Sequence, residues 1–196
     1  MAHPARMLAT EADLRAVPDD RIAHLVDGVI YSHARPRIAH AELTGALHSE
    51  LVYAFSDTRR GGPGGWLFLI EPELVLGRDI LVPDIAGWRR ERLPRAPATA
   101  QISLAPDWVC ETLSKGTEAF DRGPKRRSYA RAQVPHLWYV QPESKLIEVF
   151  RKQGDFYASV ADGLITDRIA LEPFEASPLE LGELGTWADA TDENAT

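Results

Sequence analysis

Two apolar segments of this chain each carry one carboxylate, and this pattern limits what the chain can fold into more than any other feature of the sequence. ILVPDIAGW places Asp84 among aliphatic neighbours, and DWVCETLS does the same for Glu111. Both segments have the pattern of buried strands, where an ionised carboxylate is costly unless a cation or another partner offsets its lost hydration. The fold is therefore expected to bring a compensating group to both carboxylates.

A lysine follows the second of these segments in the sequence. GPKRRSYARA carries Lys125, and its pattern predicts a helix that begins near Gly123, with Pro124 in the first turn. Strand alternation puts Glu111 on a face that it shares with apolar side chains. A lysine on a helix that packs across this face is a suitable partner, so we expect Asp84, Glu111 and Lys125 to lie together.

Hydrophobic periodicity and turn residues predict the order of the other elements. An Asp27-Gly28 pair between apolar runs predicts a hairpin, and the glycine-rich residues 61–65 mark a break. Helices are expected at 11–17, at 36–55 and from 123. Strands are expected within 21–34, 66–77, 78–88, 107–114, 136–142, 145–151 and 154–163. The order lacks the regular alternation of a doubly wound fold, so we predict an α/β or α+β domain with a mixed central sheet flanked by helices.

Length and composition predict one domain without a membrane segment. The 196 residues, 44% of them hydrophobic, suffice for a single domain over residues 1–186, and residues 187–196 are expected to form a frayed tail. No apolar run has the length of a signal peptide or a membrane span. The lone Cys110 cannot form an internal disulfide, which fits a cytoplasmic location. The net charge of −7 argues against a broad basic surface for nucleic acid.

Two carboxylates and a lysine can together support the hydrolysis of a phosphodiester. Mg²⁺ prefers hard oxygen ligands and commonly uses one or two carboxylates together with water and substrate phosphate. The ion activates a bound water, while a lysine stabilises the charge that develops on the phosphoryl group. Residue types and spacing also leave a second interpretation open, in which these residues are structural ion pairs or strand-end charges, with Asp84 capping a turn or Lys125 solvated on a helix surface.

The segments around these residues resemble a known family. VPDIAGW and PDWVCETLSKGTEAFDRGPKRRSYARAQVPHLWYVQPESKLIEVFR are similar to the Uma-type restriction endonuclease family of the PD-(D/E)XK nuclease superfamily. The motifs that match are Pro83-Asp84, Pro106–Ser114, Asp121–Lys125 and Tyr129–Trp138. The resemblance spans roughly residues 10–175 and implies a restriction-endonuclease-like core.

The resemblance also implies a metal-dependent endonuclease with a defined site. Asp84 and Glu111 would bind Mg²⁺ or Mn²⁺, with the Thr112 carbonyl as a third ligand. The usual lysine of the superfamily lies two residues after the glutamate, where this chain has Leu113, so Lys125 of the helix would take its place. The substrate would be nucleic acid, with DNA as the first expectation. The protein would act as a homodimer, because cutting both strands of a duplex needs two sites.

The chain departs from the family pattern at His24, where the family often has a glutamate. This departure and the acidic net charge leave open a catalytically silent nuclease-fold module for nucleic-acid binding or assembly. A hydrolase or binding protein for a small phosphorylated ligand is a weaker alternative.

Other polar residues near these motifs have two interpretations each. His33, His40 and His48 lack the i, i+4 spacing of a histidine metal site, but His40 is a candidate to face the active cleft. Tyr129 either lines the same site as Lys125 or packs in the core, and packing is the favoured prediction. The arginines of the helix either bind phosphates or form a solvated helix face; they are Arg122, Arg126, Arg127 and Arg131.

Overall fold

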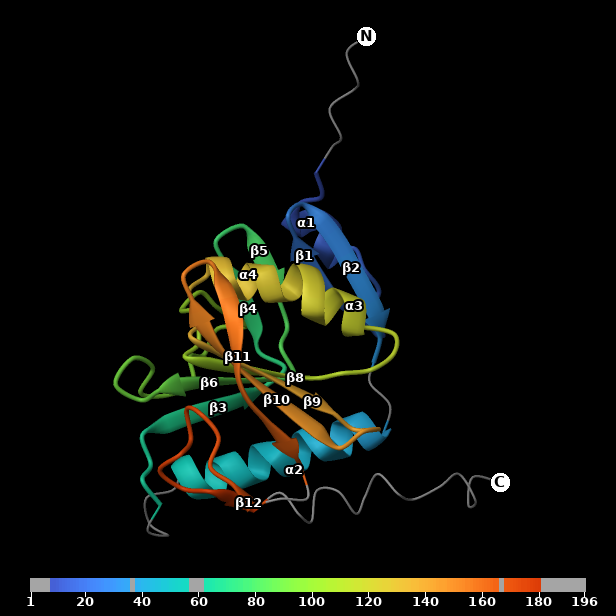
Figure 1. Ribbon diagram of the computed structural model, residues 1–196. Helices are drawn as coiled ribbons and strands as arrows, with labels where there is room; N and C mark the ends of the chain where they lie inside the picture. The colour runs from blue at the N-terminus through green and yellow to red at the C-terminus, as the bar shows by residue number, and fades with distance from the viewer. Residues whose placement is uncertain (1–7, 36–37, 57–61, 166–167, 181–196) are drawn as a thin grey trace.

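Two mixed sheets and a few helices make up the described part of the computed structural model, which is residues 8–35, 38–56, 62–165 and 168–180 (Figure 1). The long helix α2 (Ile38–Phe55) covers one face of the larger sheet. A helical segment that ends in α4 (Arg126–Arg131) covers the other face. The mixed central sheet flanked by helices is thus confirmed, in an α+β arrangement.

The larger sheet has six strands in the order β11-β10-β9-β8-β6-β3. They are β3 (Trp66–Ile70), β6 (Ile85–Arg89), β8 (Trp108–Thr112), β9 (His136–Gln141), β10 (Leu146–Gln153) and β11 (Phe156–Leu164). Only β8 and β9 pair in parallel, which requires a crossover, and the helical residues 118–131 provide it. Every residue of β8 is buried, as expected of a strand that is covered on both faces.

The smaller sheet has five strands in the order β2-β1-β5-β4-β7. They are β1 (Arg21–Val26), β2 (Val29–Ala34), β4 (Glu73–Leu76), β5 (Asp79–Leu81) and β7 (Gln101–Ile102). The predicted hairpin at Asp27-Gly28 is confirmed, because β1 and β2 pair there and both turn residues have positive φ, 51° and 70°. A separate short pair is formed by β12 (Arg168–Ile169) and β13 (Leu179–Glu180).

Two of the points at which the chain passes between the sheets, β3 to β4 and β5 to β6, are hydrogen-bonded to each other. The sequence predicts one strand-like stretch over 66–77, but the structure divides it into β3 and β4 at Glu71-Pro72. Glu71 has a φ of 46° and proline cannot donate to a ladder, so the stretch cannot continue as one strand. The chain returns to the larger sheet at Asp84, whose carbonyl accepts from Glu71 N–H at 3.0 Å. Asp84 therefore lies where the two sheets meet.

Two apolar layers hold the larger sheet in place. Below the sheet, α2 packs on aromatic residues and contributes Leu43, Leu47, Leu51 and Phe55 against Trp66, Trp108, Trp138 and Phe174. Above it, the second layer joins α4 and the smaller sheet to β8 and β9, through Tyr129, Val134, Leu74, Leu81, Val109 and Tyr139. Fully burying one large apolar side chain contributes about 1.5 to 3 kcal/mol, so each layer fixes its helix firmly.

The helix that carries Lys125 begins earlier than the sequence predicts. It starts with α3 (Glu118–Phe120) rather than near Gly123, continues as a π-helical turn η2 (Asp121–Lys125), and ends with α4. Pro124 has no N–H and cannot make the α-helical bond to the Phe120 carbonyl. The wider turn avoids this problem, because Arg126 N–H bonds to the Asp121 carbonyl instead.

The remaining predictions concern the ends of the chain. The predicted N-terminal helix is confirmed as α1 (Glu11–Arg15), which has a capping box formed by Thr10 and Asp13. The expected tail over 187–196 lies outside the described residues, as does Pro36 at the predicted start of the long helix. No helix in the described ranges is long and apolar enough to cross a membrane.

Candidate active site

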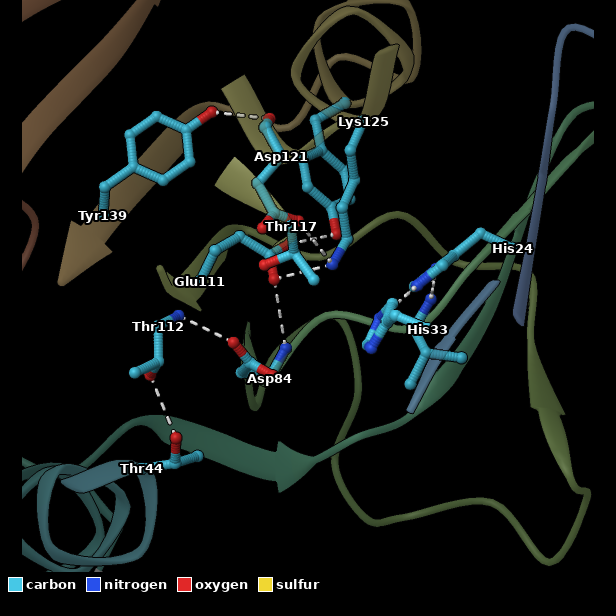
Figure 2. Close-up of polar contacts among 12 residues, drawn as sticks. His24, His33, Thr44, Asp84, Glu111, Thr112, Thr117, Asp121, Lys125 and Tyr139 are labelled. Carbon is cyan, nitrogen blue, oxygen red and sulfur yellow. Dashed lines mark hydrogen bonds and ion pairs between the residues drawn. The ribbon is translucent and has the colours of Figure 1, made fainter. Parts of the chain in front are cut away.

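Asp84 and Glu111 lie side by side at the end of the β6/β8 ladder. The antiparallel register pairs Ile85 with Cys110, so the next position brings Asp84 opposite Glu111. Asp84 N–H donates to Glu111 Oε2 at 3.4 Å, and Asp84 Oδ2 accepts from Thr112 N–H at 2.6 Å (Figure 2). Because the Asp84 carboxylate is held by the strand that carries Glu111, both acids are fixed at one point of the sheet.

Lys125 reaches Glu111 from the helical segment above the sheet. Its Nζ lies 2.7 Å from Glu111 Oε2 (Figure 2). The Tyr129 hydroxyl donates to Glu111 Oε1 at 2.6 Å. The side chains of Lys125 and Glu111 are 4% and 1% exposed, so this is a buried ion pair. A further carboxylate, Asp121, lies 3.4 Å from the same Nζ. The structure thus brings together the residues that the sequence singles out, Asp84, Glu111 and Lys125.

Burial and charge act in opposite directions on the ionisable groups of the site. Burial raises the pKa of Glu111, and the Lys125 ammonium only partly opposes this rise. Burial by itself would lower the pKa of Lys125, but the carboxylates of Glu111 and Asp121 raise that pKa above its ordinary value. Burial would raise the pKa of Asp84, yet the neighbouring His40 and Lys125 lower it. Lys125 is therefore the resident cation of the site at neutral pH.

The start of α2 reaches the site from the opposite face of the sheet. His40 Nε2 lies 3.1 Å from Asp84 Oδ1, and the hydroxyls of Thr44 and Thr112 are hydrogen-bonded at 2.9 Å. The side chains of His40 and Asp84 are each 16% exposed, so the site reaches solvent on this side. His40 therefore belongs to the site, whereas His48 lies two turns farther along the same helix.

The donor set of the site suits a hard divalent cation. Asp84, directly before β6, and Glu111, on β8, offer carboxylate oxygens at adjacent positions, and Mg²⁺ needs only one or two carboxylates from the protein. Within the described ranges, no group of three or more His, Cys, Asp and Glu side chains is arranged to hold a metal ion. A metal at this point would take its remaining ligands from water, from substrate and from a backbone carbonyl such as that of Thr112.

His24 is buried beside the site as a neutral ring. Val82 N–H donates to its Nδ1 at 3.2 Å, and its Nε2 lies 3.3 Å from Nε2 of His33, whose Nδ1 lies 2.9 Å from the Ala34 carbonyl. This network assigns the ring protons to Nε2 of His24 and Nδ1 of His33. Burial keeps the pKa of His24 well below its ordinary value. His24 therefore supplies no negative charge, and instead supports the segment that leads to Asp84.

The arginines of the helical segment are largely engaged within the protein. Their partners are Glu118 and Glu148 for Arg122, the Tyr157 carbonyl for Arg126, and Asp79 with Asp27 for Arg131. Arg127 and Arg131 are both exposed, but among the described residues Arg127 alone of the four has no ion pair or hydrogen bond from its side chain. The sequence left phosphate binding and a solvated helix face open, and three of the arginines fit neither because they pair within the protein, while phosphate contact stays available to Arg127.

The sequence left Tyr129 open between the site and the core, with the core favoured, and it did not place Asp121 in the site. Tyr129 was expected to pack in the core, and it does, but its hydroxyl also binds Glu111. Asp121, Lys125 and Tyr129 are spaced four residues apart, which puts them on one face of the helix. This spacing is the signal in the sequence that identifies both residues as neighbours of Lys125.

Comparisons with known proteins agree with this fold. A solved structure described as a putative nuclease belonging to DUF820 from Anabaena variabilis ATCC 29413 is similar with a TM-score of 0.71 at 17% identity, over 91% of this chain and 97% of that chain. At this identity the likeness shows the fold, and it confirms the restriction-endonuclease-like core that the sequence predicts. A search of curated proteins gave no match. The family model described as "Uma2: Putative restriction endonuclease" matches residues 11–181, and since this range is most of the chain, the protein belongs to the Uma2 family.

Proposed function

We propose that this protein is a metal-dependent endonuclease that hydrolyses phosphodiester bonds in nucleic acid, with DNA as its first expected substrate. Membership of a family described as restriction endonucleases supports a nuclease. The observation that carries the proposal is the meeting of Asp84, Glu111 and Lys125. Two carboxylates on neighbouring strands lie beside an ammonium group that is 2.7 Å from one of them. These are the groups that metal-assisted hydrolysis of a phosphodiester requires.

The residues of the site would have distinct roles in this reaction. Asp84, Glu111 and the Thr112 carbonyl would hold Mg²⁺ or Mn²⁺, which when bound polarises a phosphoryl oxygen and lowers the pKa of a bound water. Thr112 N–H orients the Asp84 carboxylate, and the Tyr129 hydroxyl orients that of Glu111. Lys125 keeps its proton and offers a positive charge to the phosphoryl oxygens as negative charge develops on them.

Cleavage assays with matched variants test this proposal. The wild type is expected to cut DNA with Mg²⁺ or Mn²⁺, and EDTA is expected to stop the reaction. Asp84→Asn and Lys125→Met should each lower kcat by about a hundredfold or more. Glu118→Gln is the control, because it alters a carboxylate of the same helical segment that faces Arg122 instead of Lys125. Activity that survives both Asp84→Asn and Lys125→Met would show that the reacting groups lie elsewhere.

A catalytically silent module for nucleic-acid binding or assembly is the second candidate, and one observation favours it. All four carboxylate oxygens of the acid pair already have partners in the protein, namely His40, Thr112 N–H, Tyr129 and Lys125. The pair is therefore satisfied without a metal. Calorimetric titration with Mn²⁺ in the presence of a short DNA duplex separates the candidates, since the endonuclease is expected to bind the metal and the silent module is not.

The substrate and the assembly are further parts of the proposal. Parallel assays on single-stranded and double-stranded DNA and RNA identify the preferred substrate. We also propose that the protein acts as a cytoplasmic homodimer, since cutting both strands of a duplex needs two sites. Light scattering of the purified protein, alone and with duplex DNA, measures the mass of the assembly and should give twice the mass of one chain.

A further inference from the structure

Lys125 has two carboxylate neighbours that differ in their place in the site. Glu111 lies on β8 at 2.7 Å from Nζ and is one of the two proposed metal ligands. Asp121 lies at 3.4 Å, four residues earlier on the same helical segment as Lys125. The ammonium group therefore lies between a carboxylate that a metal would share and a carboxylate that belongs to its own helix.

A metal ion bound by Glu111 would compete with Lys125 for that carboxylate. Both cations would be drawn to the same buried oxygen atoms, and they would repel each other at short range. The lysine side chain is only 4% exposed, so the ammonium group cannot return to water without moving its helix. A buried ammonium that loses its counterion is strongly destabilised. A second carboxylate is needed if Lys125 is to stay in place as a cation.

We propose that Asp121 is a positioning residue that keeps the Lys125 ammonium in the site when a metal ion occupies Glu111. The inference rests on the proposed metal-dependent function and adds a residue to it. Asp121 contacts neither the metal nor the substrate in this account. It acts through Lys125 alone, as the counterion that remains when Glu111 is shared with the metal.

The local structure holds Asp121 firmly enough for this role. Its side chain is 6% exposed, and its backbone carbonyl accepts from the Tyr139 hydroxyl at 2.9 Å (Figure 2). The π-helical turn begins at Asp121 and ends at Lys125, with Pro124 inside it. Such turns are rare and often lie at functional sites. Here the turn sets the position of Asp121 relative to Lys125.

Nuclear magnetic resonance of the lysine ammonium groups tests the inference directly. The chain has four lysines, Lys115, Lys125, Lys145 and Lys152, so the ¹⁵Nζ spectrum is simple. A buried ammonium exchanges slowly with water, unlike that of Lys115, whose side chain is 86% exposed. In the wild type and in the Glu118→Gln control, the Lys125 ¹⁵Nζ signal should change its chemical shift but remain visible at saturating Mg²⁺ with a non-cleavable DNA duplex. Asp121→Asn should show it without metal and lose it when metal is added.

Two results of this titration would overturn the inference. The first is a Lys125 signal that persists in Asp121→Asn at saturating metal as it does in the wild type. The second is a Lys125 signal that does not respond to metal in any variant, because the metal would then not compete for Glu111.

Cleavage kinetics give a second and separate measurement. Asp121→Asn should lower kcat about tenfold to a hundredfold and leave KM for DNA and the midpoint of the Mg²⁺ dependence within about twofold, because the variant displaces a charge without touching substrate or metal. A KM effect with unchanged kcat would contradict the positioning role. If the wild type cuts no nucleic acid, the proposed function fails, whereas the ammonium signals still decide the role of Asp121.

A third comparison applies if Asp121→Asn does not fold. In Lys125→Met, Asp121 has lost its counterion, so adding Asp121→Asn should raise the Tm of that variant. A double variant with a lower Tm than Lys125→Met would overturn the inference, since Asp121 would then not serve as the counterion of Lys125.

Discussion

Replacing Lys125 by methionine is expected to expose the electrostatic arrangement of the site. Methionine is close to lysine in length and apolar, so packing is largely kept while the charge is removed. Glu111 and Asp121 then lose the cation that lies 2.7 and 3.4 Å from them in the wild type. The Lys125 and Glu111 side chains are 4% and 1% exposed, so water cannot replace the lost partner.

The magnitude follows from the burial of the pair. Removing one partner of a buried ion pair costs about 3 to 5 kcal/mol, because it leaves an uncompensated buried charge. For a domain of this size the loss corresponds to about 6 to 20 °C in Tm. Lys115→Met is the matched control. Lys115 pairs with Glu143 at the surface, where the side chains are 86% and 67% exposed, and losing such a pair costs about 1 kcal/mol or less.

The loss in Lys125→Met is expected to depend on pH and on metal. Burial raises the pKa of Glu111, and in the wild type the Lys125 ammonium partly opposes this rise. The variant lacks the ammonium, so the pKa of Glu111 should rise further. When the pKa of a carboxyl group is raised in the folded state, the protein loses stability as the pH rises above the unfolded value of 4.5. In the wild type the pKa of Glu111 is raised to about 8, so both proteins lose this stability alike up to that pH, and the gap between them should widen above about pH 8. Mg²⁺ should raise the Tm of the variant more than that of the wild type, because the ion takes the place of the missing cation.

Urea unfolding at several pH values, with and without Mg²⁺, measures this prediction. Tryptophan fluorescence is a suitable signal, since Trp66, Trp108 and Trp138 lie in the core. A Lys125→Met protein that is as stable as the wild type at pH 8 without metal would show that the ammonium group does not offset the buried carboxylates. So would a gap that narrows as the pH rises.

Two further predictions concern residues that support the site. Asp79→Asn should cost about 1.5 to 3 kcal/mol at pH 7, because Asp79 accepts from Ser128 and Arg131. Burial by itself would raise the pKa of Asp79, but these bonds lower it. In urea titrations, the difference in stability between the wild type and Asp79→Asn should therefore disappear as the pH falls below 3.8. A difference that stays constant with pH would contradict this assignment. His24→Asn keeps an acceptor for Val82 N–H but cannot be protonated. Burial lowers the pKa of His24, so the wild type should lose stability as the pH falls below 6.5, and the variant should lose less. Equal slopes of stability against pH for the two proteins would show that the His24 ring does not stay neutral.

The centre of the site could be predicted from the sequence because its residues violate the local pattern. Asp84 and Glu111 are charged residues in sequence segments that are otherwise apolar and strand-like, and such positions need a partner. The strand register then places the two acids opposite each other. The connection after β8 is short, so the helical segment that follows brings Lys125 back to Glu111 of β8. The hairpin at Asp27-Gly28 was predictable for a similar reason, since its turn chemistry is local.

The parts that could not be predicted depend on contacts between distant segments. Nothing local to residues 66–77 shows that β3 and β4 join different sheets, because this depends on which strands lie beside them. The early helix start at Glu118 was missed because Pro124 usually marks a first turn, and here a π-helical turn accommodates it. The contact of His40 with Asp84 joins α2 to β6 across the sheet, and periodicity within α2 gives no sign of it.

The anomalous signal of Mn²⁺ soaked into a crystal of the protein shows directly whether Asp84 and Glu111 bind one metal ion together. We expect one anomalous peak within about 2.0 to 2.4 Å of carboxylate oxygens of both Asp84 and Glu111, and no peak in Glu111→Gln. The Lys125 ammonium should remain beside the ion. No peak between the two carboxylates at saturating Mn²⁺ in a protein that still cleaves DNA, or a peak on His24 and His33 instead, would contradict this expectation.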